Sequence, residues 1–324
     1  MYQITYLFGA GASANALPIN KKMDGESAPS QFISELERFK TTIEQFDEAS
    51  IHLDRIEEIL KICMELGTPD LCAKYLLETA NMPKYRLLKR LISNYFSYKE
   101  TVIEARPNIY STFGRNEPRP LSFLTAISSD QKLPSNVKII SWNYDSQMEI
   151  AAEKLRLFNV NAPNKIDGFS SWPNIGSDFN RDFVASPPFL MHINGIAGYN
   201  YSLRNFAEPI ENPLSLDDEA DSLLSFAWEI AEDGKRLFTE RRQKILEKMC
   251  EGTKYLVVIG YSFPFFNRKF DKLIFQKMAP SLEKIYIQDP YNDGRELKAQ
   301  YDLGRKVEIV HINNADSYFI PYEF

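Results

Sequence analysis

The sequence predicts an α/β fold: a Rossmann-like, mostly parallel sheet with helices on both faces. Six short apolar runs rich in β-forming residues alternate with segments of helical periodicity, an order typical of parallel sheets. Glycine or polar residues follow directly after five of these runs. Because open α/β sheets bind ligands outside the carboxyl ends of their strands, these five segments are the first candidates for a functional site.

The first apolar run, residues 4–8, predicts a buried strand that ends at a glycine loop, residues 9–13. A helix is expected to open at Ser13, and Pro18 ends it early. The next segment, residues 26–110, has no strand pattern and predicts a helical insertion. Its apolar residues recur at helical spacing, as in Phe32, Leu36 and Phe39, and again in Ile56, Ile59, Leu60 and Cys63.

The other five apolar runs predict strands at residues 137–142, 189–193, 255–260, 284–288 and 307–311. Helices are expected over 145–157 and 217–249. The segment 159–186 is rich in Asn, Pro, Gly and Ser, which predicts a long surface loop. We expect one domain, whose Rossmann-like core comprises residues 1–25 and 111–324.

Composition and charge exclude several classes of protein. The net charge of −6 argues against broad nucleic-acid binding, which depends on clustered positive charge. Three cysteines form neither a disulfide framework nor a four-cysteine zinc site, and no cluster has metal-ligand spacing, so no metal is expected. No apolar run reaches the ~18 residues of a membrane span, and the first residues lack the positive region of a signal peptide. A cytoplasmic protein that does not enter membranes is therefore expected.

The glycine loop consists of Gly9, Ala10, Gly11, Ala12 and Ser13. Small residues after a strand let the backbone approach a phosphate, and the N–H groups that follow donate hydrogen bonds to it. The loop lacks the third glycine of the full dinucleotide fingerprint. A tight turn between strand and helix is the alternative interpretation.

Two pairs of polar residues follow later strands. Asn143 and Asp145 come after the second strand and can reach one ligand from the sheet edge, or they cap a helix, which both residue types favour. His192 and Asn194 come at the third strand. Residues two apart in a strand point to the same face, so these two side chains can share a site; a structural histidine is the alternative.

Together these segments resemble the sirtuin-like family in its broad sense. That family has a Gly-Ala-Gly-x-Ser loop after the first strand, Asn-x-Asp after a middle strand, then His-Gly, and finally Gly-x-Ser. Its bacterial defence members often extend the last motif to Gly-Tyr-Ser-x-Pro. The matching segments here are residues 9–13, Asn143-Tyr144-Asp145, Asn194-Gly195 and Gly260-Tyr261-Ser262-Phe263-Pro264, together with Leu17-Pro18 and the run Ile56-Glu57-Glu58-Ile59-Leu60.

Two departures from the family pattern narrow the resemblance. Deacylating sirtuins usually carry a four-cysteine zinc ribbon, which this chain cannot build, so the resemblance is to the NADases of bacterial antiphage defence. The second departure lies at the catalytic histidine: alignment on Gly195 puts Asn194 in that position, with His192 two residues earlier.

The resemblance implies an NAD+ glycohydrolase that cleaves the nicotinamide–ribose bond and depletes NAD during infection. Asn143 would orient the ribose and the attacking water, Asp145 would place the nicotinamide, and His192 would act as general base. NAD would be held by Gly9, Ala10, Gly11, Ala12, Ser13, Asn194, Gly195, Gly260, Tyr261 and Ser262, and Asp289 would hold the adenosine ribose.

Three alternatives remain open. Asn194 favours a module that binds NAD or an ADP-ribose derivative without cleaving it, whereas Asn143 and Asp145 favour the hydrolase. A protein deacylase is disfavoured by the missing zinc ligands. The chain is also compatible with an assembly subunit, in which a homo-oligomer or a separate defence protein provides the trigger.

Overall fold

The structure is a computed structural model, which describes residues 3–19, 30–45, 52–105, 117–130, 132–157, 169–173, 182–201, 207–210, 212–214, 216, 222–229, 236–303 and 306–324. Its centre is a seven-stranded sheet whose strands lie in the order β3-β4-β2-β1-β7-β8-β9. All neighbouring strands pair in parallel. The strands are β1 (Gln3–Phe8), β2 (Val137–Ser141), β3 (Ser171–Trp172), β4 (Leu190–His192), β7 (Thr253–Ile259), β8 (Lys284–Gln288) and β9 (Glu308–Ile312).

The strand order has one topological switch point, between β1 and β7. From β1 the chain builds outward through β2 to β4, and it then returns to add β7, β8 and β9 on the other side of β1. Without the short edge strand β3, this is the order of the classic dinucleotide-binding sheet, which binds ligands in the crevice at the switch point. Tyr6 of β1 pairs with Ile139 on one side and with Val257 on the other.

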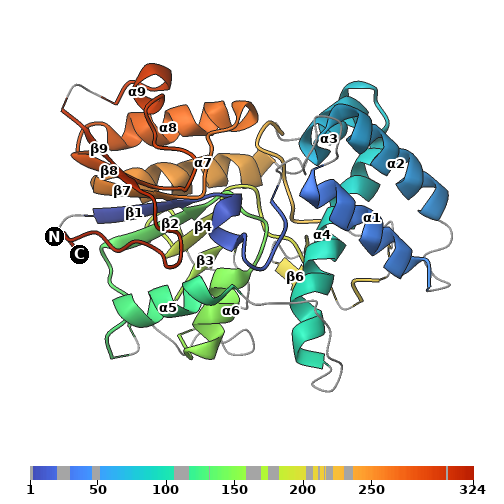
Figure 1. The fold of residues 1–324 in the computed structure, drawn as a ribbon, viewed down its shortest axis with the longest axis horizontal. Helices are drawn as coiled ribbons and strands as arrows, with labels where there is room; N and C mark the ends of the chain where they lie inside the picture. The colour runs from blue at the N-terminus through green and yellow to red at the C-terminus, as the bar shows by residue number, and fades with distance from the viewer. Residues whose placement is uncertain are drawn as a thin grey trace.

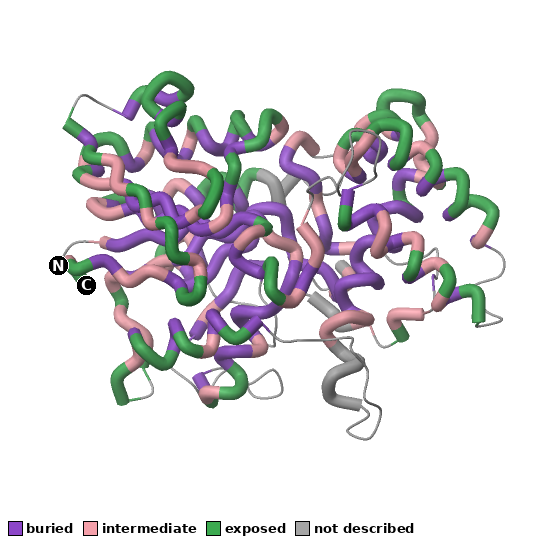
Figure 2. The backbone as a smooth tube through the Cα atoms, in the orientation of Figure 1, coloured by how far each residue is buried: buried purple, intermediate pink, exposed green. Residues whose placement is uncertain are grey.

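Helices cover both faces of the sheet, as Figure 1 shows. On one face α5 (Pro118–Ile127) and α6 (Gln147–Lys154) pack on alternate strand residues such as Tyr6 and Ile139. On the other face α7 (Arg236–Cys250) and α8 (Arg268–Met278) pack on the intervening residues, such as Leu7. In Figure 2 the strands are the most continuously buried part of the chain. The short helix α9 (Leu297–Gln300) follows β8 and precedes β9 in the chain.

Four helices form a separate lobe beside the carboxyl edge of the sheet (Figure 1). They are α1 (Gln31–Ile43), α2 (Leu53–Leu66), α3 (Pro69–Glu78) and α4 (Met82–Ala105), and we call them the helical lobe. The sequence marks their ends: Ser30 and Thr68 cap α1 and α3 by accepting from backbone N–H groups, and Gly67 ends α2 in the left-handed conformation.

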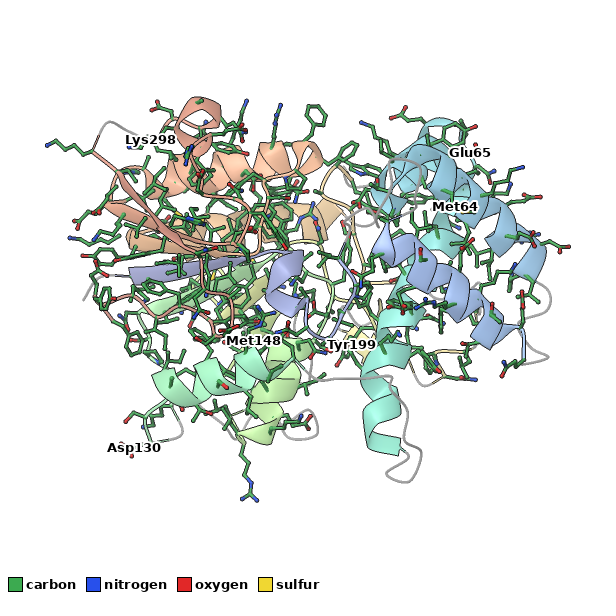
Figure 3. The ribbon with its side chains drawn as sticks, in the orientation of Figure 1. Met64, Glu65, Asp130, Met148, Tyr199 and Lys298 are labelled. Carbon is green, nitrogen blue, oxygen red and sulfur yellow. The ribbon has the colours of Figure 1, made fainter. Side chains whose placement is uncertain are left out.

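The helical lobe has its own apolar core, centred on side chains such as Leu36, Ile59 and Leu91. It is tied to the sheet by α4, whose Glu100 accepts from the backbone N–H of Ser146 and so caps the start of α6. Figure 3 places Met64 and Glu65 on the outer side of α2, whereas Met148 lies beneath the sheet. Met64 is accordingly 41% exposed and Met148 only 5%.

The predicted fold class is confirmed, and all six predicted strands are present in a mostly parallel sheet. Within the described part of residues 26–110, the chain forms helices and contributes no strand to that sheet. Among the helices of the described ranges, none combines the length and apolar character of a membrane span.

Three local predictions were wrong. Of the helix expected over 217–249, the structure has α7 from Arg236, whereas residues 222–229 form bends and turns that bury apolar side chains against the helical lobe. Residues 217–221 and 230–235 lie outside the described ranges. The short helix expected from Ser13 is instead a 3-10 turn, η1 (Ala10–Ser13). Within the loop predicted over 159–186, Ser171 and Trp172 form β3 instead, and Ser171 pairs with Leu190; residues 159–168 and 174–181 lie outside the described ranges. A small hairpin, β5 (Tyr199–Tyr201) with β6 (Ala207–Pro209), was not predicted.

Candidate functional site

A cavity of about 460 Å³ lies where the switch point of the sheet meets the helical lobe. Its lining combines the segments that follow β1, β2, β4 and β7 with α1, α3, α4 and η4 (Phe265–Asn267). Of the residues predicted for the site, it contains Gly9, Ala10, Ser13, Asn143, Asp145, Asn194, Gly260, Tyr261 and Ser262. Gly11, Ala12, His192, Gly195 and Asp289 are not among its lining residues.

The glycines are required because two loops pack backbone against backbone. A Cβ atom on Gly11 would lie 2.6 Å from the Cα of Gly260, and one on Gly9 would lie 2.6 Å from the carbonyl oxygen of Gly260. The N–H of Gly11 donates to that same oxygen at 3.0 Å. Gly260 also has a positive φ of 58°, which favours glycine. The loops after β1 and β7 are thereby fixed side by side at the switch point.

Ser13 connects the two polar residues that follow β2. The side-chain amide of Asn143 donates to the Ser13 hydroxyl over 3.2 Å, and that hydroxyl hydrogen-bonds the carboxyl group of Asp145. Because a hydroxyl both donates and accepts, Ser13 serves both neighbours at once. The structure therefore brings together the polar ends of the glycine loop and the Asn-x-Asp segment, as the strand-end argument predicted.

Two carboxyl groups line the cavity, one from the sheet and one from the helical lobe. Burial raises the pKa of Asp145 above its ordinary value, and the hydrogen bond from Ser13 opposes that shift. Asp70, in the first turn of α3, was not predicted from the sequence; burial raises its pKa to about 6. A cation in the cavity would favour the ionised form of both carboxyl groups.

His192 is held away from the cavity by two hydrogen bonds. It is 2% exposed; its Nε2 lies 2.8 Å from a carboxylate oxygen of Glu149 on α6, and its Nδ1 lies 3.0 Å from the carbonyl oxygen of Asn143. Both partners accept, so both ring nitrogens donate when Glu149 is ionised. Burial works to lower the pKa of His192, but the charge and hydrogen bond of Glu149 outweigh it and raise that pKa. Both ring nitrogens of His192 are thus occupied by acceptors, and the contact with the Asn143 carbonyl anchors the backbone after β2.

This ion pair predicts a specific pH dependence of stability. Because the folded pKa of His192 is raised above its ordinary value of about 6.5, the pair stabilises fully below that pH. The stabilisation is lost as pH rises through the folded pKa, and each unit of displacement is worth about 1.4 kcal/mol. We expect the wild type to exceed the Glu149→Gln, His192→Gln double variant in unfolding free energy at about pH 6, and the difference to shrink toward about pH 9. Urea denaturation across this range measures it, and a difference that grows with pH contradicts the assignment.

Asn194 occupies the cavity wall while His192 does not, because β4 ends at His192. Asn194 lies in the turn beyond the strand, where the rule of alternating faces no longer applies. Gly195 completes this turn with a φ of 71°, and a Cβ on it would lie 1.9 Å from the carbonyl oxygen of Leu223. The two side chains predicted to share one face are thus separated.

A second cavity of about 390 Å³ lies beside the first, and Ser262 lines both. Its other residues come mainly from the loop after β8, including Arg295. Asp289 starts that loop, but its carboxylate accepts from the backbone N–H groups of Tyr291 and Asn292 and therefore shapes the turn. Tyr261 lies in the first cavity and donates to the buried Asp271.

The lining of the first cavity is aromatic and acidic. Seven aromatic side chains contribute to it: Phe32, Phe96, Trp142, Tyr144, Tyr261, Phe265 and Phe266. Among the described residues that line it there is no lysine, arginine or histidine. The lining residues contributed by the helical lobe could not be predicted from the sequence, because no local pattern indicates that α1, α3 and α4 face the strand ends. Such a lining suits a planar, positively charged group.

No protein-family model matches the chain, and no curated protein matches it. In the part of the chain that the structure describes, no three His, Cys, Asp or Glu side chains are grouped to hold a metal ion.

Proposed function

We propose that this chain is a sirtuin-like NAD+ glycohydrolase that binds NAD+ in the cavity at the switch point. One observation carries the proposal: an aromatic lining with two carboxyl groups, Asp70 and Asp145, and no cationic side chain among the described lining residues. The nicotinamide ring of NAD+ is planar and positively charged, so the aromatic faces and the carboxylates attract it. The sequence resemblance points to the same ligand.

The proposed reaction breaks the bond between the ribose C1 carbon and the nicotinamide nitrogen. The bonding electrons leave with the ring, which becomes neutral nicotinamide, and positive charge develops on the ribose. The carboxylate of Asp145, which lines the cavity, would stabilise this charge in its ionised form. Asn143 orients the ribose and the water that attacks C1, and the departing proton leaves to solvent. No role for His192 is required.

The adjoining cavity offers room for the rest of the dinucleotide. Ser262 lines both cavities, so a ligand passing Ser262 reaches from the aromatic wall to the loop after β8. Among the described residues that line the second cavity, Arg295 is the one cationic side chain; it pairs with Asp293 and would be available to the anionic part of NAD+.

A second candidate function is binding of NAD or an ADP-ribose derivative without hydrolysis. The observations that favour it are Asn194 in the cavity wall and His192 paired with Glu149, which leave the described lining without a histidine base. In either case the resemblance extends the proposal to bacterial antiviral defence, with a homo-oligomer or a separate partner protein as the trigger.

The test is incubation of the purified chain with NAD+, with and without the products of neighbouring genes. Calorimetry measures binding, and chromatography measures nicotinamide and ADP-ribose. Equimolar release of the two products supports the hydrolase. Binding without release in every mixture supports the second candidate, and absence of binding contradicts both.

A further inference from the structure

A positively charged side chain is buried next to the turn that follows β4. Arg242 of α7 is 1% exposed, and burial lowers its pKa to about 10, so it stays charged at neutral pH. No carboxylate of the described residues forms an ion pair with it: Glu229, whose charge opposes the shift, pairs with Lys89. A buried charge without a counterion weakens a fold, which points to a role for Arg242 other than stability.

The contacts of Arg242 join α7 to two segments beside the cavity. Its Nη1 donates to the carbonyl oxygen of Ile193 at 3.1 Å and to the hydroxyl oxygen of Ser225 at 3.2 Å. The central carbon of the guanidinium lies 4.8 Å from the centre of the Phe270 ring, which adds a cation–π contact. The guanidinium thereby connects the first residue after β4 with the segment 222–229.

These contacts fix the two peptide units that flank Asn194. The carbonyl of Ile193 belongs to the peptide unit before Asn194, and Arg242 donates to it. The carbonyl of Asn194 belongs to the unit after it and accepts from the N–H of Ser225 at 2.7 Å. Because peptide units are planar, their orientations set the φ and ψ of the residue between them. The backbone of Asn194 is therefore held on both sides.

The side chain of Asn194 depends on this backbone for its direction. Among the described residues, its amide has one hydrogen-bond contact, to the main-chain carbonyl of Trp142, and at 3.4 Å this contact is long. Asn194 belongs to the described lining of the first cavity, whereas Arg242 and Ser225 do not. Arg242 can therefore affect a ligand in the cavity through Asn194, without touching the ligand itself.

We propose that Arg242 is a positioning residue, which holds Asn194 in the orientation that contacts the ligand. This inference rests on the proposed function, in which Asn194 is one of the residues that bind NAD+. Without the guanidinium, the carbonyl of Ile193 and the hydroxyl of Ser225 lose their shared donor. The peptide units around Asn194 then gain freedom to rotate, and its side chain no longer keeps one direction.

The experiment is a double-mutant cycle, measured by calorimetric titration of the full chain with NAD+. It comprises the wild type, Arg242→Met, Asn194→Ala and the double variant. We expect each single variant to bind NAD+ about tenfold more weakly, the effect of one lost hydrogen bond. In the Asn194→Ala background, Arg242→Met is expected to change the affinity by less than about twofold, because the side chain that Arg242 positions is already absent.

A merely structural role predicts a different result. Arg242→Met would then weaken binding by the same factor in both backgrounds, and this outcome overturns the inference. Unchanged affinity of Asn194→Ala also overturns it, since Asn194 would then make no contact with the ligand. Arg241→Met is the matched control, because Arg241 is the neighbouring arginine of α7, has an exposed side chain and lies outside the described cavity lining. It is expected to leave the affinity unchanged.

If Arg242→Met does not fold, Ser225→Ala takes its place in the cycle. It removes the hydroxyl that accepts from Arg242 and keeps the N–H that donates to Asn194. A loss of affinity that disappears in the Asn194→Ala background supports the inference, whereas an equal loss in both backgrounds, or no loss, overturns it. A wild type that does not bind NAD+ overturns the proposed function and the inference together. Independent effects in a chain that binds NAD+ overturn the positioning role alone.

Discussion

Replacement of Arg119 by methionine is expected to lower the free energy of unfolding by about 3–5 kcal/mol, the typical effect of removing one partner from a buried ion pair. Arg119 is 5% exposed and its Nε lies 2.6 Å from a carboxylate oxygen of Glu117, which is 3% exposed. Its charge and hydrogen bonds lower the pKa of Glu117 against the effect of burial. Without Arg119, the buried carboxylate has no counterion among the described residues.

The same guanidinium holds the glycine loop. One terminal nitrogen of Arg119 donates to the carbonyl oxygens of Gly11 and Ala12, at 3.1 and 3.0 Å. Tyr318 donates to the Ala12 oxygen from the other side, and the guanidinium lies over its ring. Loss of Arg119 therefore removes its hydrogen bonds to the glycine loop in addition to the ion pair. We expect the affinity for NAD+ to decrease together with the free energy of unfolding.

Chemical denaturation measures this effect, and Arg295→Met is the control. Arg295 also pairs with a neighbouring acid, Asp293, but its side chain is 89% exposed, so its loss is expected to cost less than about 1 kcal/mol. The Glu117→Gln, Arg119→Met double variant is expected to recover part of the stability lost in the single variant, because it removes the unpaired charge. A single variant as stable as the control contradicts the role assigned to Arg119.

The sheet could be predicted because of how parallel strands are buried. Helices cover both faces, so each central strand is a nearly continuous apolar run, and segments such as 253–259 and 284–288 stand out in the sequence. The convergence of Ser13, Asn143 and Asn194 could be predicted for a related reason: the carboxyl ends of parallel strands meet at one edge. No comparable rule predicts which residues of the helical lobe face the sheet edge, so the position of Asp70 and Phe96 in the cavity lining could not be predicted from the sequence.

The interpretation of His192 depended on contacts that no local pattern reveals. Its partner Glu149 lies on α6, which returns across the face of the sheet, and this places the carboxylate under the end of β4. The glycine loop is a similar case. Its small residues suggested approach to a phosphate, whereas Gly9 and Gly11 are required first by contact with Gly260, which is 249 positions from Gly11 in the chain. Substitution of Gly9 or Gly11 therefore disrupts packing against Gly260, and a loss of binding in such a variant would not show that the loop contacts the ligand.

Asn143→Ala tests catalysis more directly than substitution of the glycines, because the backbone of Asn143 is fixed independently of its side chain. The N–H of Asn143 donates to the hydroxyl of Ser141 at 3.1 Å, and its carbonyl accepts from His192. The side chain is held by one hydrogen bond, to Ser13, and lines the cavity. Alanine thus removes the amide and leaves the surrounding loop in place.

If the chain hydrolyses NAD+, Asn143→Ala is expected to slow nicotinamide release by about 10²-fold, because ribose and water lose the group that positions them. Initial rates at saturating NAD+ measure this, with unfolding curves to verify that the variant is folded. Asn81→Ala is a suitable control, since Asn81 is an asparagine outside the cavity whose side chain accepts from the N–H of Lys84. The wild-type rate should survive in the control. Undiminished release by Asn143→Ala would remove Asn143 from the mechanism and leave Asp145 as the carboxyl group from the loop after β2 in the described lining.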